Sequence, residues 1–178
     1  YNFNSIIKLK PNQIILKDIK YKKDENVNSE IEFNGEYIIN KKINLRDINF
    51  KENNNYIKIS NLILSKNLKI IDFDKIELKY LNENKKLNNL NVFKKNNNVE
   101  LSSKNFDGKS FISNLLMAGS NNALLNRFVN FNSQIYLNFD QFLIDDKNYL
   151  QNVNGNLYIE KNKIRSGKIA AKLNNLSQ

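Results

Sequence analysis

Cysteine, histidine and tryptophan are absent from this chain of 178 residues, and proline occurs only once. Without cysteine, no disulfide, thiolate metal site or thiol nucleophile can form. Without histidine, the commonest metal ligand and acid–base group is missing. The five glycines are scattered and form no phosphate-binding GxGxxG or GxxxxGK[ST] loop. We therefore expect the chain to have no catalytic residues, to bind no metal and to need no cofactor.

Long hydrophobic runs are also missing. No run approaches the roughly 18 apolar residues that span a bilayer, and the first residues do not have the pattern of a signal peptide. The chain begins at Tyr1 rather than at methionine. We therefore expect residues 1–178 to form a single β-rich segment of a longer protein, with any signal or membrane anchor outside it.

The formal net charge is +10, which is typical of proteins with acidic partners such as nucleic acid or anionic lipid. However, asparagine makes up about a fifth of the chain and lysine far outnumbers arginine, as expected for an AT-rich genome. Part of the lysine excess then reflects AT-rich codons rather than an acidic partner. Stacking aromatics could be supplied by Tyr37, Tyr56, Phe73, Tyr80 and Phe93. Arginine is scarce and no RNP-like run is present, so a basic nucleic-acid-binding domain is the least favoured alternative and we expect no nucleic-acid partner.

Short apolar runs, many with a period of two, recur along the chain. They lie at 6–9, 14–21, 31–39, 43–50, 56–64, 68–73 and 76–81, and later at 135–139, 153–159 and 164–173. Runs of this length, rich in Ile, Phe and Tyr, predict about a dozen strands in meander order. The domain is therefore expected to be mainly antiparallel β.

Alternation is clearest at 135–140 and 153–160. Ile135, Leu137 and Phe139 share one face of a strand, whereas Asn138 and Asp140 share the other. Such strands form a sandwich, a closed barrel or a long curved sheet with one apolar face. The pattern leaves these three architectures open. Asn-rich gaps at 51–55, 82–89 and 94–98 predict loops, because asparagine tolerates left-handed backbone angles.

The sheet pattern breaks after "FDG" at 106–108. Apolar residues at 111, 112, 115 and 116, and again at 124, 125, 128 and 129, follow the spacing of two short amphipathic helices around 108–130. Asp107 or Ser110 could cap the first helix, and we expect Gly108 to relax the backbone between strand and helix. The helices would either plug an open end of the sheet or line a groove or membrane surface.

Two pairs of carboxylates were considered as chemical sites. Asp72 and Asp74 lie two apart, so they could share a strand face and hold a cation. Lysines flank this pair, and Asp145 and Asp146 precede Lys147-Asn148, a turn composition. Both pairs are therefore predicted to be solvated turn or strand-end residues.

The segments "VELSSKNFDGKSFISNLL" and "SQIYLNFDQFLIDDKNYLQNVNGNLYIEKNKIRSGKIAAKL" together resemble the AsmA-like superfamily of bacterial envelope proteins, especially the central region of its YhdP-type members. The resemblance covers 99–173 and consists of a strand, "FDG", a short helix, a variable stretch and three further strands. Residues 61–80 look like the preceding strands of that family. Residues 1–60 match only as generic strands.

The resemblance implies a taco-like β-groove that shelters or conducts phospholipid acyl chains between the inner and outer membranes. It also implies a periplasmic location, a role in outer-membrane biogenesis, and an inner-membrane anchor outside this chain. The candidate groove-lining residues are Ile135, Leu137, Phe139, Leu157, Ile159, Ile169 and Leu173. The candidate groove-covering helix residues are Phe111, Leu115, Leu116, Leu125 and Phe128. The main alternative is a structural β-sandwich or spacer whose same residues form a dry core. The oligomeric state is left open.

Overall fold

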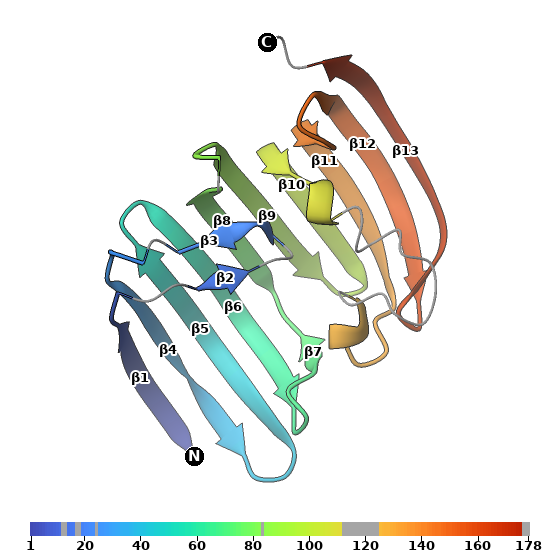
Figure 1. Ribbon diagram of the computed structural model, residues 1–178. Coiled ribbons are helices and arrows are strands. Elements are labelled where there is room, and N and C mark those ends of the chain that lie inside the picture. Colours follow the sequence, from blue (N-terminus) through green and yellow to red (C-terminus); the bar gives the residue numbers. More distant parts are fainter. Residues whose placement is uncertain (12–13, 17–18, 24, 83, 112–124, 176–178) are drawn as a thin grey trace.

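The computed structural model describes residues 1–11, 14–16, 19–23, 25–82, 84–111 and 125–175. They form one large, curved, mainly antiparallel sheet that is not closed into a barrel (Figure 1). In spatial order its strands are β1 (Asn2–Leu9), β4 (Ser29–Ile38), β5 (Lys42–Glu52), β6 (Asn55–Ser65), β8 (Lys75–Leu81), β9 (Leu87–Lys95), β10 (Asn98–Asp107), β11 (Ser133–Leu143), β12 (Asn148–Glu160) and β13 (Lys163–Asn175). The short β7 (Ile70–Asp72) pairs with β6. The predicted mainly β fold and the curved-sheet architecture are confirmed.

Strand order departs from a simple meander at two points. A separate two-stranded hairpin, β2 (Ile15–Leu16) and β3 (Tyr21–Lys22), is inserted between the neighbouring strands β1 and β4. Strands β10 and β11 run parallel, and parallel neighbours need a crossover connection. The segment 108–132 makes that crossover, which explains why the strand pattern breaks there. The predicted meander order holds for the other strands, and the inserted hairpin and the parallel pair are the two departures from it.

The crossover contains only short helical pieces among its described residues. Helical backbone begins at 109–111, and a 3-10 turn spans Leu125–Arg127. The rest of the two predicted helices, including Leu115 and Leu116, lies outside the described residues. Within the part of the chain that the structure describes, no helix has the length and apolar character to cross a bilayer.

Left-handed asparagines make the tight turns. Asn53 has a φ of 48° between β5 and β6, and Asn96 has a φ of 56° between β9 and β10. The predicted loops at 51–55 and 94–98 are therefore confirmed in their centres. The predicted loop at 82–89 is partly wrong, because β9 begins at Leu87. Asn88 there is buried, and its side-chain oxygen accepts a 2.7 Å hydrogen bond from the backbone N–H of Asp107.

In β5 and β6, irregular pairing keeps apolar side chains on one face at a point where strict alternation in the sequence would move them to the other face. Asp47 pairs with Ser60 and Leu45 with Leu62, so Arg46 and Asn61 are left out of the ladder. Asn61 has a φ of 51° at this point. Because one residue is skipped on each strand, Leu45 and Leu62 stay on the same face as Ile48 and Ile59.

The "FDG" motif joins β10 to the crossover. The Asp107 carboxylate accepts a hydrogen bond from the backbone N–H of Lys109 at 3.4 Å, as a cap would. It also accepts one from the side-chain amide of Asn82 at 3.2 Å. Gly108 has no left-handed φ; instead, an added Cβ would lie 1.9 Å from Cζ of Phe142. The expectation that Gly108 relaxes the backbone is therefore wrong, and its role is to make room for an aromatic ring.

Candidate functional site

One row of paired residues crosses ten strands on the same face of the sheet. In strand order it consists of Ser5, Phe33, Ile48, Ile59, Ile76, Val92, Leu101, Leu137, Gly155 and Ile169. We call it the apolar row, because all members except Ser5 and Gly155 are hydrophobic. Neighbouring strands lie about 4.8 Å apart, so the row is about 40 Å long. The face that carries it is called the apolar face.

The β2–β3 hairpin covers part of the apolar face. The ring of Tyr21 meets the rings of Phe50 and Tyr80 edge-on, with centroids 5.8 and 5.5 Å apart. Its hydroxyl donates a 2.6 Å hydrogen bond to Glu52, and the hydroxyl of Tyr80 donates to the carbonyl of Ile19. Desolvation, followed by the Glu52 hydrogen bond, raises the pKa of Tyr21 well above its usual range. These contacts fix the hairpin over β5 and β8.

The end of the crossover covers a second part of the face. Leu125 and Phe131 are buried, and the rings of Phe128 and Phe131 lie 4.6 Å apart. The backbone N–H of Val129 donates to the carbonyl of Ile70 at 2.8 Å. Because of this cover, the apolar row is buried at Val92, Leu101 and Leu137, whose exposed fractions are 9%, 6% and 8%. The middle of the apolar row is therefore covered by other residues of the same chain.

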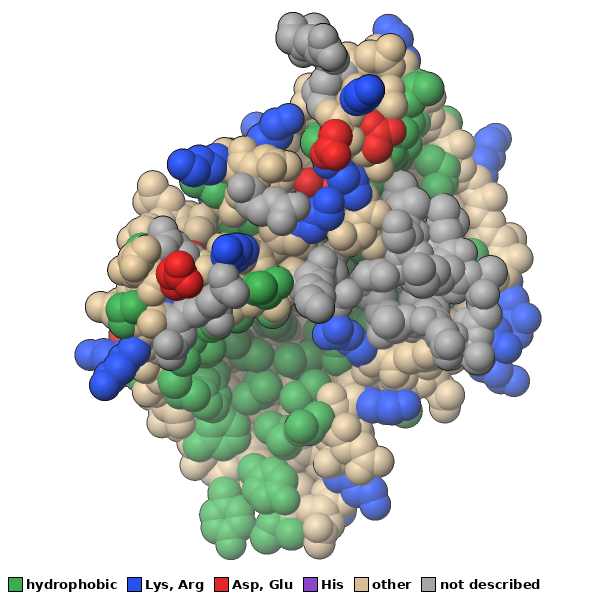
Figure 2. All heavy atoms as spheres, in the orientation of Figure 1, with side chains coloured by type: hydrophobic (Ala, Val, Ile, Leu, Met, Phe, Trp, Pro, Cys, Tyr) green, Lys and Arg blue, Asp and Glu red, His purple; other side chains and the backbone are tan. Residues whose placement is uncertain are grey.

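Away from the hairpin, no described residue covers the same face over β1, β4, β5 and β6. We call this region the open apolar patch; it consists of Phe3, Ile7, Phe33, Tyr37, Ile43, Leu45, Ile48, Ile59, Leu62 and Leu64. Ile7 and Tyr37 are 44% and 41% exposed, and the others are half-buried. Figure 2 shows hydrophobic side chains gathered on this part of the surface, at the lower left. A contiguous exposed apolar surface on a folded chain is typical of a binding site.

The residues predicted from the sequence to line the groove lie on this apolar face, but mostly in its covered part. Ile135, Leu137, Phe139, Leu157 and Ile159 are all buried. Ile169 and Leu173, on the edge strand β13, are 53% and 61% exposed. Of the predicted covering residues, Leu125 is buried and Phe111 and Phe128 pack against the core. Leu115 and Leu116 lie outside the described residues.

The sequence did not single out the open apolar patch. The strands that carry the patch do alternate: Phe3, Ser5 and Ile7 share one face of β1, and Ile31 and Phe33 share one face of β4. Half-buried and buried strands share this signal, because alternation shows which face is apolar and not what covers it. The cover is decided by where the β2–β3 hairpin and the crossover lie, which depends on contacts between residues distant in sequence.

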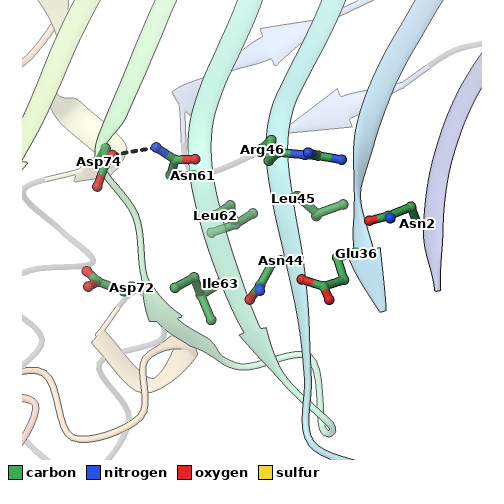
Figure 3. A pocket seen from close by; sticks show the side chains of 10 residues that line it. All are labelled: Asn2, Glu36, Asn44, Leu45, Arg46, Asn61, Leu62, Ile63, Asp72 and Asp74. Carbon is green, nitrogen blue, oxygen red and sulfur yellow. Dashed lines mark hydrogen bonds between the residues drawn. The ribbon is translucent and has the colours of Figure 1, made fainter. Parts of the chain in front are cut away.

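The opposite face carries polar side chains and a shallow cavity of about 370 Å³ (Figure 3). Asp72 and Asp74, the carboxylate pair whose spacing could hold a cation, both line it. Asp72 pairs with Lys94 at 2.6 Å, and Asp74 accepts a 2.6 Å hydrogen bond from Asn61. Each carboxylate therefore has its own partner. Among the described residues, no group of three or more potential metal ligands comes together.

Asp145 and Asp146 form the turn that their composition predicts. Asp145 accepts 2.7 Å hydrogen bonds from the backbone N–H groups of Lys147 and Asn148. Its pKa is lowered, chiefly by the Asn148 side chain and then by the Lys147 backbone. Asp146 pairs with Lys109, and the hydrogen bond from that lysine lowers the pKa of Asp146. The pair has a structural explanation in this turn.

The five aromatic residues considered for nucleic-acid stacking do not form one platform. Phe73 and Tyr80 are buried, and Tyr37 lies on the apolar face. Tyr56 and Phe93 lie on the opposite face. Stacking along a strand of nucleic acid needs aromatic rings on one accessible surface, and this arrangement does not provide it.

Comparison of the chain with protein-family models, with curated proteins and with solved structures finds no match. The open apolar patch is a feature of the described surface that no packing contact within the described residues explains. An uncharged, continuous sheet face can bind an extended apolar ligand by removing it from water.

Proposed function

We propose that this chain is a segment of an AsmA-like, YhdP-type envelope protein, whose sheet shelters or conducts phospholipid acyl chains between the inner and outer membranes. In this proposal the full-length protein is periplasmic and anchored in the inner membrane, and the segment itself has no catalytic role. The observation that carries the proposal is the open apolar patch. Its ten side chains lie on one face of an open sheet, next to a row that continues across the other strands.

The dimensions of the patch support an acyl chain as ligand. A bilayer core is about 30 Å thick, so one acyl chain extends over about 15 Å. The patch spans four strands, or about 15 Å across the strands. Each methylene group removed from water contributes about 0.8 kcal/mol, so a bound acyl chain would gain substantial free energy from contact with this surface.

Two adjacent isoleucines in β1 allow a matched test. Ile7 lies on the apolar face, in register with Ile31, and is 44% exposed. Ile6 lies on the opposite face and is 59% exposed. Both occupy the same edge strand, so Ile7→Asp and Ile6→Asp disturb the fold to a similar degree. They differ in which face receives the charge.

The experiment is native mass spectrometry of the protein after incubation with dioleoyl-phosphatidylcholine vesicles and removal of the vesicles. We expect wild-type protein and Ile6→Asp to carry lipid, and Ile7→Asp and Leu45→Asp to lose most of it. Circular dichroism would confirm that each variant keeps its strand content. Lipid-free wild-type protein, or equal lipid loss in Ile6→Asp and Ile7→Asp, would overturn the proposal and favour a structural role.

A further inference from the structure

Lysines are gathered at one end of the open apolar patch. The turn between β4 and β5 carries Lys41, with Lys42 at the start of β5, and the turn between β6 and β7 carries Lys66 and Lys69. We call these four residues the lysine rim. The surrounding stretches 37–45 and 62–71 contain no aspartate or glutamate. The nearest acidic residues in sequence, Glu36 and Asp72, line the cavity on the opposite face of the sheet.

The pairing of β5 with β6 brings the two turns together. Lys42 pairs with Ser65, and the backbone N–H of Ser65 donates to the carbonyl of Lys69 at 2.8 Å. Lys41, Lys66 and Lys69 are exposed and Lys42 is half-buried. Immediately inside the rim, Ile43 pairs with Leu64 on the open apolar patch. Lys41 and Lys66, in the two turns, thus border an uncovered apolar surface, while Lys42 lies at the same end of the sheet on the face opposite Ile43.

The other end of the same strands has mixed charge. Glu30 and Glu52 lie there beside Lys51, and Lys51 pairs with Glu32 at 3.8 Å. The Glu52 carboxylate accepts the hydrogen bond from Tyr21, which belongs to the hairpin. On the apolar face, the rim end therefore carries lysines without acidic residues, and no rim lysine forms an ion pair with a described residue.

We propose that the lysine rim binds the phosphate group of an anionic phospholipid whose acyl chain lies on the open apolar patch. This inference rests on the proposed function and adds the headgroup class of the ligand. Lysine stems lie along apolar surfaces while their ammonium groups reach water. Ammonium groups bind phosphate as point charges, and clustered lysines attract anionic lipid headgroups. A zwitterionic lipid would gain less at this rim, because its own cation offsets the phosphate.

The test is a competition between two lipids with the same acyl chains. The protein is incubated with vesicles of equimolar dioleoyl-phosphatidylglycerol and dioleoyl-phosphatidylcholine, and the lipids that it carries are counted by native mass spectrometry. The rim variant replaces Lys41, Lys42, Lys66 and Lys69 by Gln. A control variant with the same net charge replaces four exposed lysines away from the rim, Lys10, Lys22, Lys79 and Lys86, by Gln.

We expect wild-type protein and the control variant to prefer the phosphatidylglycerol by about tenfold, as a few exposed ion pairs would give. The rim variant should still carry phosphatidylcholine but lose that preference. A rim variant with the wild-type preference, or equal binding of the two lipids by wild-type protein, would overturn the inference and leave the proposed function intact. Equal loss of preference in both variants would show general charge attraction and also overturn it. Wild-type protein that carries neither lipid would overturn the proposed function itself.

Discussion

The hydroxyl of Tyr21 donates a 2.6 Å hydrogen bond to the carboxylate of Glu52, and both side chains are buried. This contact joins the β2–β3 hairpin to the end of β5. Tyr21→Phe would keep the ring contacts with Phe50 and Tyr80 but remove the donor. Glu52 would keep its 2.9 Å hydrogen bond from Asn55. A buried carboxylate that loses a donor costs about 1–3 kcal/mol, so we expect a loss of that size in urea unfolding.

Tyr136 offers the matched control for this substitution. It is 38% exposed and lies on the polar face of β11. Tyr136→Phe should change the free energy of unfolding by less than about 0.5 kcal/mol, as is usual at the surface. If Tyr21→Phe changed the free energy of unfolding as little as Tyr136→Phe, the hydrogen bond to Glu52 would not stabilise the position of the hairpin.

Two buried tyrosines predict a loss of stability at alkaline pH. Desolvation raises the pKa of both Tyr21 and Tyr80, with Glu52 adding to the first and Asp107 to the second. An unfolded tyrosine ionises near pH 10. Because the folded pKa is the higher one, this stabilisation is complete below about pH 10 and is lost as the pH rises above it. Urea midpoints measured between about pH 8 and pH 11 should therefore fall.

Lysines also titrate in that range, so the double variant Tyr21→Phe/Tyr80→Phe provides the reference for this effect. Its midpoint should fall less steeply with pH than that of the wild-type protein. Parallel curves for the two proteins would show that these phenols do not contribute to the alkaline transition.

Gly108 is predicted to tolerate no side chain. An added Cβ would lie 1.9 Å from Cζ of Phe142, and that ring packs against Phe106 and Phe139. Overpacking of this kind costs about 1–3 kcal/mol or more, and we expect Gly108→Ala to lower the unfolding midpoint accordingly. Adding Phe142→Leu should recover part of the loss, because the smaller side chain frees the space. Strictly additive effects would contradict direct contact as the cause.

Leu137 belongs to the covered part of the apolar row, and Ile169 belongs to an uncovered part. Leu137 is 8% exposed and Ile169 is 53% exposed. A buried, unpaired carboxylate costs several kcal/mol, so we expect Leu137→Asp to unfold the protein or to lower its melting temperature strongly. Ile169→Asp should cost less than about 1 kcal/mol. A normally folded Leu137→Asp protein in circular dichroism would mean that the crossover does not seal this part of the sheet.

Much of the sheet could be predicted from the sequence, because its strands carry local signals. Alternation at Ile135, Leu137 and Phe139 correctly indicates one apolar face. Asparagine turns such as Asn53 and Asn96 end strands where the composition indicates. The parallel pairing of β10 with β11 could not be predicted in this way, because it depends on where a long crossover returns.

The candidate site was less predictable than the fold. Leu137 and Ile7 have the same kind of alternating sequence context, yet one is covered and the other is exposed. The difference comes from Tyr21 and Phe131, which belong to the inserted hairpin and to the crossover and pack over only part of the face. Sequence patterns identify a surface that must be removed from water, whereas tertiary packing decides whether the chain or a ligand removes it.

The open ends of the sheet have a consequence for the evolution of its size. In a barrel, strand number and diameter are linked, so the circumference must be rebuilt whenever strands are gained or lost. Here β1 and β13 are free edges in the described chain. A duplicated hairpin could extend the row by about 10 Å without changing its cross-section. In such an architecture, the length of the apolar row is set by how many hairpins a gene encodes.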